Sequence, residues 1–203
     1  MGTNAPAMPL ISALEALRDV RGDRAVITSM GSAREWPRIS QHPLDFHYIP
    51  STMGGVIPLG VGLALARPER EFVVLCGDGS LLMNLGTLVT VAASGAANLA
   101  IVLLNNSVYE VTGGQATAGA SANVDFGRVA EDCGIRTVRA FDDADIWRAE
   151  AAATLGLAGP RFIELSVAAV TDDYRLESPG AVGPRLAAFR QALAASATSG
   201  GGG

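Results

Sequence analysis

Two apolar segments that each end in a short polar turn constrain the fold of this chain more than any other feature. The first, residues 71–76 (EFVVLC), leads into residues 77–79 (GDG), and the second, residues 99–104 (LAIVLL), leads into residues 105–106 (NN). Short apolar runs bounded by turn residues are typical of strands buried on both faces of a parallel sheet. Because residues 81–93 can form a crossover helix, the pattern predicts a strand–helix–strand unit whose polar turns meet at one sheet edge.

The expected crossover helix carries signals at both of its ends. Ser80 stands where an N-cap is expected, and Gly95 stands just past the last helical residue. Free amides at the start of a helix favour an anion, and Gly77 and Gly79 let the backbone approach that anion closely. An apolar stripe suited to covering a sheet is formed by Leu81, Leu85, Leu88 and Ala92.

Asp78 and Asn106 are the two polar side chains that this arrangement brings to the carboxyl edge of the sheet, where open α/β folds bind ligands. One carboxylate, one amide oxygen and a nearby backbone carbonyl suit a hard cation that keeps room for phosphate oxygens. A lone GDG is usually only a turn, and a lone NN is usually only a loop. Their joint position after two buried strands predicts a magnesium–diphosphate site.

The rest of the chain alternates between expected helices and strands. The alternation predicts an α/β fold with a doubly wound, mainly parallel sheet flanked by helices. We expect one domain over residues 9–196, with a flexible N-terminus at 1–8 and a flexible tail at 197–203. The expected segments are a helix at 10–20, a strand at 24–28, a long connection at 29–52, a helix at 125–132, a strand at 136–141, a helix at 143–155, a strand at 161–167 and a helix at 184–195.

Residues 107–122 are rich in glycine and alanine and carry little that would hold them in place. Such a segment often becomes ordered only when a ligand or partner binds.

Charge and cysteine content exclude several classes of function. The formal net charge of −5 offers no electrostatic footprint for nucleic acid or an anionic membrane. Two cysteines, Cys76 and Cys133, are too few for a secreted disulfide scaffold. Residues 79–109 carry no charge, but their polar and glycine interruptions favour a helix and a buried strand over a membrane span. We therefore expect a cytoplasmic protein that binds neither nucleic acid nor membrane.

The paired turns and their spacing are similar to the cofactor motif of thiamin diphosphate enzymes. Residues 105–115 (NNSVYEVTGGQ) look like the corresponding loop of sulfopyruvate and phosphonopyruvate decarboxylases, and residues 51–54 (STMG) with the small-residue segment 55–66 resemble a Gly-Ser-Met-Gly segment of the same enzymes. The resemblance runs from about residue 10 to about residue 170. It implies a thiamin diphosphate-binding fold of the diphosphate-binding type.

The resemblance also implies a role for individual residues. Asp78, Asn106 and the carbonyl of Val108 would hold Mg²⁺, and Gly79 and Ser80 would contact the diphosphate. Met53 would be the bulky residue beneath the cofactor, while its amide and the carbonyl of Ser51 would bond the aminopyrimidine edge. The loop 112–115 would lie near diphosphate or substrate. The complete implied set of cofactor-binding residues is Ser51, Met53, Gly77, Asp78, Gly79, Ser80, Asn106, Val108, Tyr109, Thr112 and Gly113.

Two positions depart from the family pattern. Ser107 stands where relatives often have Gly or Asp, and Ser51-Thr52 replaces the usual Gly-Ser. The second change keeps the backbone hydrogen bonds but stiffens the turn.

No residue of this chain is assigned as catalytic. His47 lies four residues before Ser51 and could shuttle protons there, but a histidine in a solvated or interface loop is the commoner case.

The chain has room for one domain of ordinary size, whereas full-length members of the family carry two similar domains. The glutamate that activates the pyrimidine ring in relatives lies on the other domain. The resemblance therefore implies a pyrimidine-binding, α-type partner subunit that supplies this glutamate, in a hetero-oligomer of two copies of each chain or more.

The expected activity is decarboxylation of a small anionic 2-oxoacid, dependent on thiamin diphosphate and Mg²⁺. Two alternatives stay open: a carboligase that uses the same cofactor to form acyloins or acetolactate, and a non-catalytic scaffold domain. The intact pair of Asp78 and Asn106 favours an active enzyme over a scaffold.

Overall fold

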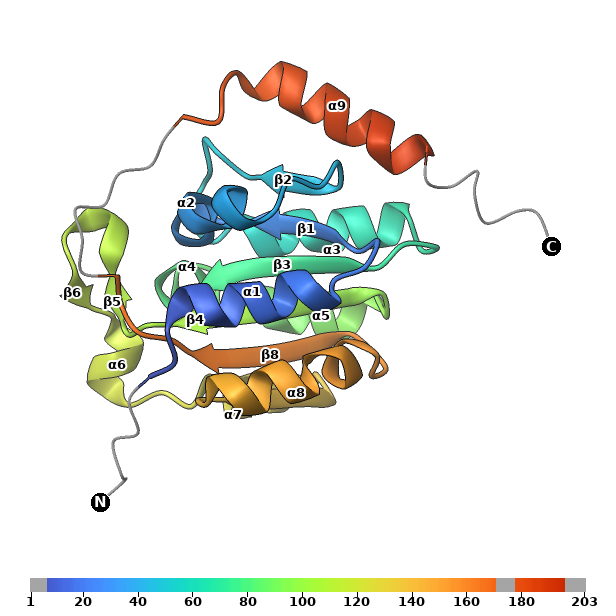
Figure 1. Cartoon of the computed structure of the whole chain (residues 1–203). Helices are drawn as coiled ribbons and strands as arrows, with labels where there is room; N and C mark the ends of the chain where they lie inside the picture. Colours follow the sequence, from blue (N-terminus) through green and yellow to red (C-terminus); the bar gives the residue numbers. More distant parts are fainter. Residues whose placement is uncertain (1–6, 171–177, 196–203) are drawn as a thin grey trace.

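A six-stranded sheet with strand order β2-β1-β3-β4-β8-β7 forms the centre of the computed structural model, which describes residues 7–170 and 178–195 (Figure 1). Every neighbouring pair of strands in this sheet is parallel. The structure thus confirms the expected doubly wound parallel architecture. The strands are β1 (Ala25–Thr28), β2 (Asp45–His47), β3 (Phe72–Gly77), β4 (Leu99–Asn105), β7 (Thr137–Phe141) and β8 (Arg161–Ser166).

Strands β3 and β4 are the two apolar runs that the sequence analysis paired. They lie side by side in a register that runs from Phe72 opposite Leu99 to Gly77 opposite Leu104. Both strands are buried along almost their whole length, because helices cover the sheet from both sides. The polar turns after them therefore meet at one edge of the sheet, as predicted.

The crossover between these strands differs from the single helix that we expected over 81–93. It consists of α4 (Asp78–Leu82) and α5 (Thr87–Ser94), joined by a turn. The turn brings Asn84 against Gly54, where its side-chain amide donates to the Gly54 carbonyl at 3.1 Å. A Cβ on Gly54 would lie only 2.7 Å from the Asn84 Cβ, so this contact requires glycine. The leucine stripe continues through the break between α4 and α5. A periodicity analysis of the sequence therefore does not reveal the break.

The two ends of this crossover give one correction and one confirmation. The residue that precedes the first turn of α4 is Gly77, so Ser80 lies inside the helix and is not its N-cap. Gly95 ends α5 in the left-handed conformation, with φ of 69°, as its position predicted.

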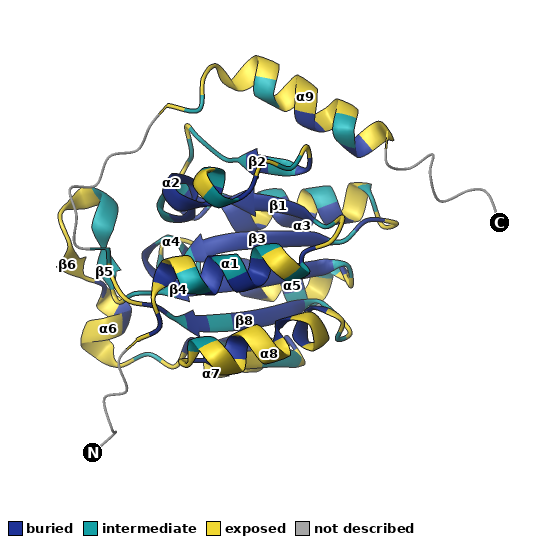
Figure 2. Cartoon of the chain, in the orientation of Figure 1, coloured by how far each residue is buried: buried dark blue, intermediate teal, exposed yellow. Residues whose placement is uncertain are grey.

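Helices cover both faces of the sheet (Figure 2). Alternate strand residues belong to two separate apolar cores. Val73 and Leu75 of β3 point to one core, whereas Val74 and Cys76 point to the other. The first core is closed by α1 (Leu10–Val20), α2 (Met30–Ile39) and α8 (Ala144–Leu155), and the second by α3 (Val56–Ala66), α5, α7 (Phe126–Asp132) and α9 (Val182–Ala195).

The expectation of a long irregular connection over residues 29–52 was wrong. Helix α2 follows β1 directly, and β2 then pairs in parallel with β1 as the edge strand of the sheet. Pro37 lies inside α2, and this breaker together with the polar residues around it masked the helix in the sequence. The fully buried Trp36 anchors α2 on the sheet.

Residues 107–122 also have more structure than the sequence indicated. They form a small antiparallel hairpin, followed by a short helix at the carboxyl edge of the main sheet (Figure 1). Its hairpin strands pair Val108 with Ala116 and Tyr109 with Gln115. The elements are β5 (Val108–Tyr109), the 3-10 turn η1 (Glu110–Thr112), β6 (Gln115–Ala116) and α6 (Ala118–Ala122).

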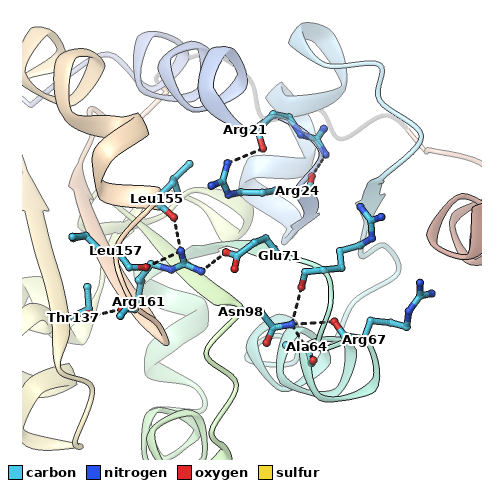
Figure 3. Close-up of polar contacts among 12 residues, drawn as sticks. Arg21, Arg24, Ala64, Arg67, Glu71, Asn98, Thr137, Leu155, Leu157 and Arg161 are labelled. Carbon is cyan, nitrogen blue, oxygen red and sulfur yellow. Dashed lines mark hydrogen bonds and ion pairs between the residues drawn. The ribbon is translucent and has the colours of Figure 1, made fainter. Parts of the chain in front are cut away.

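Polar side chains hold the opposite, amino edge of the sheet together (Figure 3). The guanidinium of Arg161 donates to the carbonyls of Leu155 and Leu157 and pairs with Glu71, which joins β8 to the start of β3. The side-chain nitrogen of Asn98 contacts the carbonyl oxygens of Ala64, Arg67 and Arg70 at 2.7–3.1 Å. These contacts satisfy carbonyls that helix ends would otherwise leave without partners.

The folded unit begins earlier in the chain than expected. Met8 is buried and bridges to Val167, so it belongs to the folded unit and not to a flexible N-terminus. Residues 1–6 and the predicted tail at 197–203 lie outside the described residues. Within the part of the chain that the structure describes, no helix has the length and apolar character needed to cross a membrane.

Candidate cofactor site

A pocket lies at the carboxyl ends of β1, β3 and β4, where the sequence analysis placed the ligand site. Most of the residues predicted to bind the cofactor line this pocket together. They are Met53, Gly77, Asp78, Gly79, Ser80, Asn106, Val108, Tyr109 and Thr112. Ser51, Gly113 and His47 are absent from this lining. Its other members are Ser29, Met30, Gly31, Glu110 and Val111.

Asp78 lies at the tip of β3 and is the buried charge of the pocket. Its side chain is 1% exposed, and one of its oxygens accepts a hydrogen bond from the Thr117 hydroxyl at 2.9 Å. Burial raises the pKa of Asp78, and hydrogen bonds from Thr117 and from the amides of Gly79 and Asn106 oppose that rise. A proton and a cation therefore compete for this carboxylate, and binding of a cation is favoured as the pH rises.

The turn after β4 is fixed by the two asparagines, which make different contacts. The side-chain oxygen of Asn106 accepts from the Val108 amide at 3.1 Å, on the pocket side of the turn. Asn105 instead donates to Glu164 of β8 at 2.8 Å and accepts from the Ser107 amide at 3.2 Å. Ser107 has φ of 65°, a left-handed conformation that is uncommon for a residue other than glycine.

Thr117 is a residue of the site that sequence reasoning missed. It is fully buried, its hydroxyl donates to Asp78, and its amide donates to the Ser107 carbonyl at 2.9 Å. The same hydroxyl accepts from the Ala120 amide and so caps α6. Thr117 thus ties the tips of β3 and β4 to the β6–α6 segment. Nothing in its sequence neighbourhood, which is rich in small residues, marks it.

We expect Thr117→Val to weaken the binding of the cation and cofactor predicted for this pocket by about tenfold, which is the lower end of the range for loss of a partner that orients a ligand. The valine keeps the shape of the side chain but removes the donor to Asp78. Thr117→Ser keeps the hydroxyl and should bind within about twofold of the unmodified protein on the same grounds. Calorimetric titration measures both variants, and equal affinities for valine and serine would contradict the assignment.

Ser80 and Asn84 attach the segment that carries Met53 to the crossover. The Ser80 hydroxyl accepts from the Gly54 amide at 3.0 Å, and Asn84 donates to the Gly54 carbonyl. Gly54 itself has φ of 79°, which favours glycine at this turn. The contacts place Met53 in the pocket wall, directly beside α4.

The ring of Tyr109 packs over Gly79. A Cβ at Gly79 would lie 2.5 Å from a ring carbon of Tyr109, so only glycine permits this approach. Tyr109 belongs to β5, and Glu110 next to it accepts from the Val170 amide at 2.6 Å. The hairpin is thereby held against the start of α4 and forms one wall of the pocket.

The two histidines make local contacts away from the pocket. His47 lies at the end of β2, with its Nδ1 at 3.1 Å from the Thr28 hydroxyl, and burial lowers its pKa. His42 accepts from the Leu44 amide at 3.2 Å and shapes the turn before β2. His47 lies beside a separate hollow that is lined by Arg34 and Arg38.

The cysteines differ in accessibility, which gives a chemical test of the fold. Cys76 is fully buried, and burial raises its pKa to about 12, whereas Cys133 is partly exposed. We expect iodoacetamide at about pH 8 to modify Cys133 alone in the native protein, because the thiolate is the reactive form. Peptide mass spectrometry identifies the modified site. Rapid labelling of Cys76 before unfolding would contradict the buried position of β3.

The donor atoms in the pocket fit a hard cation bound to phosphate oxygens. Asp78 has a carboxylate oxygen, Asn106 an amide oxygen and Val108 a backbone carbonyl, and all three residues line the pocket, whose lining includes no histidine or cysteine. The described residues contain no cluster of three or more His, Cys, Asp or Glu side chains suited to a metal. A hard cation held by so few protein oxygens would need further oxygen ligands, which a bound diphosphate could supply.

Comparisons with known proteins identify the family of this chain. Residues 28–165 match the family model described as thiamine pyrophosphate enzyme, C-terminal TPP binding domain. Sulfopyruvate decarboxylase subunit beta of Methanothermobacter thermautotrophicus is 42% identical over 158 residues, which cover 77% of this chain and 80% of that subunit. Phosphonopyruvate decarboxylase of Streptomyces viridochromogenes is 38% identical over 82% of this chain, and the match covers 41% of that enzyme.

Solved structures show the same fold. The thiamine diphosphate-dependent 4-hydroxybenzoylformate decarboxylase of Rhodococcus jostii RHA1 superposes with a TM-score of 0.66 at 20% identity. The match covers 82% of this chain and 34% of that one.

The chain therefore belongs to the thiamine pyrophosphate enzyme family and is of its C-terminal, TPP-binding domain type. Within that family it is a thiamin diphosphate-dependent decarboxylase subunit, similar to sulfopyruvate decarboxylase subunit beta.

Proposed function

We propose that this chain is the diphosphate-binding subunit of a heteromeric, Mg²⁺-dependent decarboxylase that acts on a small anionic 2-oxoacid. The observation that carries the proposal is the position of Asp78 and Asn106, which line one pocket at the tips of adjacent strands. Relatives that are sulfopyruvate and phosphonopyruvate decarboxylases support the substrate class.

Different residues of the pocket would hold different parts of the cofactor. Asp78, Asn106 and the Val108 carbonyl would hold Mg²⁺, and the backbone at Gly79 and Ser80 would face the diphosphate. Met53 would support the cofactor from below, on a segment fastened to α4 through Ser80. When bound, thiamin diphosphate supplies the electron sink for loss of carbon dioxide, and the protein contributes orientation and electrostatics.

The proposal includes a pyrimidine-binding, α-type partner subunit. The relative with 42% identity is named as a subunit, which supports a partner chain. The family resemblance implies that this partner carries the pyrimidine-activating glutamate. Two large apolar side chains of the β3–β4 crossover are exposed to solvent: Met83, in the turn after α4, and Val89 of α5 are each 55% exposed. A partner chain that covers this crossover would bury both of them.

Co-expression with a candidate partner gene, followed by assays against a panel of 2-oxoacids, tests this function. We expect the pair to release carbon dioxide and an aldehyde from a sulfonated, phosphonated or similar 2-oxoacid, and this chain alone to show no more than about 1% of that turnover. Full turnover by this chain alone would contradict the need for a partner. A 2-hydroxyketone as the main product would show a carboligase instead, and absence of thiamin diphosphate binding in both states would show a scaffold.

A further inference from the structure

Helix α9 follows the residues that match the family model, and it packs beside the edge strand β2 (Figure 1). Most residues of α9 are exposed (Figure 2). Phe189 and Leu193 are buried and belong to the same core as residues of α3 and β2. Phe189 stacks on Phe46 of β2 with ring centroids 5.1 Å apart. Arg67, at the end of α3, donates to the Leu193 carbonyl at 2.8 Å. The helix is therefore docked at both its middle and its end.

Arg185, in the first turns of α9, makes the most specific contacts of the helix. Its guanidinium donates to the His47 carbonyl at 2.7 Å and to the Ile49 carbonyl. The same group donates to the Gly180 carbonyl at 3.2 Å and lies over the Phe46 ring, 6.0 Å from the centroid. One planar fork thus bridges two carbonyls that follow one another closely along the chain, a geometry that a lysine ammonium does not reproduce.

These carbonyls begin the segment that leads to the cofactor pocket. The chain passes from His47 through Ser51 to Met53 and ends the segment at Gly54, which Ser80 and Asn84 hold. Arg185 holds the beginning of the segment and α4 holds its end. Ser51 and Met53, the residues expected to meet the pyrimidine ring, lie between the two anchors.

We propose that Arg185 is a positioning residue that holds the 47–54 segment in place for pyrimidine binding, and that α9 is the clamp that carries Arg185. The inference rests on the proposed function, since it assigns the segment to the cofactor. Fixing a loop before the ligand arrives removes the ordering cost from binding, so the clamp acts on cofactor affinity. The Mg²⁺ contact that we propose for Asp78 is separate from this clamp.

Hydrogen exchange of the chain without cofactor tests whether Arg185 holds the 47–54 segment in place. Arg185→Ala should speed amide exchange in peptides that span 48–55, while peptides from β3 and β4 keep their protection. Arg190→Ala is the matched control, because it removes the same charge from an exposed position on the same helix. Equal exchange of the 48–55 peptides in the two variants would overturn the clamp.

Cofactor titration of the reconstituted complex tests whether holding this segment increases the affinity for thiamin diphosphate. Arg185→Ala should raise the Kd for thiamin diphosphate about tenfold, and millimolar guanidinium chloride should restore most of the loss, whereas sodium chloride at the same ionic strength should not. Arg185→Lys should restore little, and Arg190→Ala should bind like the unmodified protein.

The two measurements separate the two proposals. An unchanged Kd in Arg185→Ala, or a raised Kd that guanidinium does not rescue, would overturn the positioning role. If the unmodified complex fails to bind thiamin diphosphate, the proposed function and the cofactor role of the segment fail together, and the exchange measurement still decides whether Arg185 holds the segment.

Discussion

Asp78→Asn should abolish cofactor binding and leave the fold intact. The variant keeps the size of the side chain and an oxygen that can accept from Thr117, but it removes the charge that Mg²⁺ requires. Because loss of even an outer partner of a metal site costs about 10–100-fold in affinity, we expect the affinity for Mg²⁺ and thiamin diphosphate to fall by at least about 100-fold. Decarboxylation by the reconstituted complex should fall at least as far.

The unchanged fold is the informative part of this prediction. Burial raises the pKa of Asp78, so the folded protein binds a proton at this carboxylate more tightly than the unfolded chain does. The ionised form therefore opposes folding at neutral pH, and its removal should not lower the melting temperature. Asp132→Asn is a control for the charge change, because Asp132 is exposed on α7. Cofactor binding by Asp78→Asn at the unmodified affinity would contradict the metal assignment.

Gly60→Val should strongly destabilise the domain. Gly60 lies buried in α3, and a Cβ there would be 2.3 Å from a methyl carbon of Val74 in the centre of β3. Overpacking of this kind costs about 3 kcal/mol, because helix and sheet must move apart. For a chain of this size, a loss of that order lowers Tm by about 6–12 °C.

The matched control for this substitution lies on the same helix. Gly62 is exposed, and a Cβ there would meet no heavy atom within 4 Å, so Gly62→Val should melt close to the unmodified protein. Circular dichroism during heating compares the two variants. Equal melting temperatures would show that α3 does not approach β3 as closely as the structure indicates.

The centre of the fold could be predicted because its signals are local and redundant. Strands β3 and β4 are continuous apolar runs, and the parallel arrangement leaves little choice about where Asp78 and Asn106 meet. The end of α5 at Gly95 was predictable for the same reason, since a left-handed cap favours glycine.

The parts that escaped prediction depend on contacts between distant segments. Pro37 and its polar neighbours hid α2, whose position is fixed by the burial of Trp36. The break between α4 and α5 serves the contact of Asn84 with Gly54, which no periodicity reveals. Thr117 could not be assigned to the site from the sequence, because its partner Asp78 lies on another element.

The most direct test is a crystal of the complex with its partner, grown with thiamin diphosphate and Mn²⁺ in place of Mg²⁺. Mn²⁺ accepts the same oxygen ligands and scatters anomalously, so its position can be located without a model of the protein. We expect one anomalous peak between the carboxylate of Asp78, the side-chain oxygen of Asn106 and the carbonyl of Val108, with the diphosphate on its open side. A peak elsewhere, or a diphosphate bound away from the tips of β3 and β4, would contradict the proposed site.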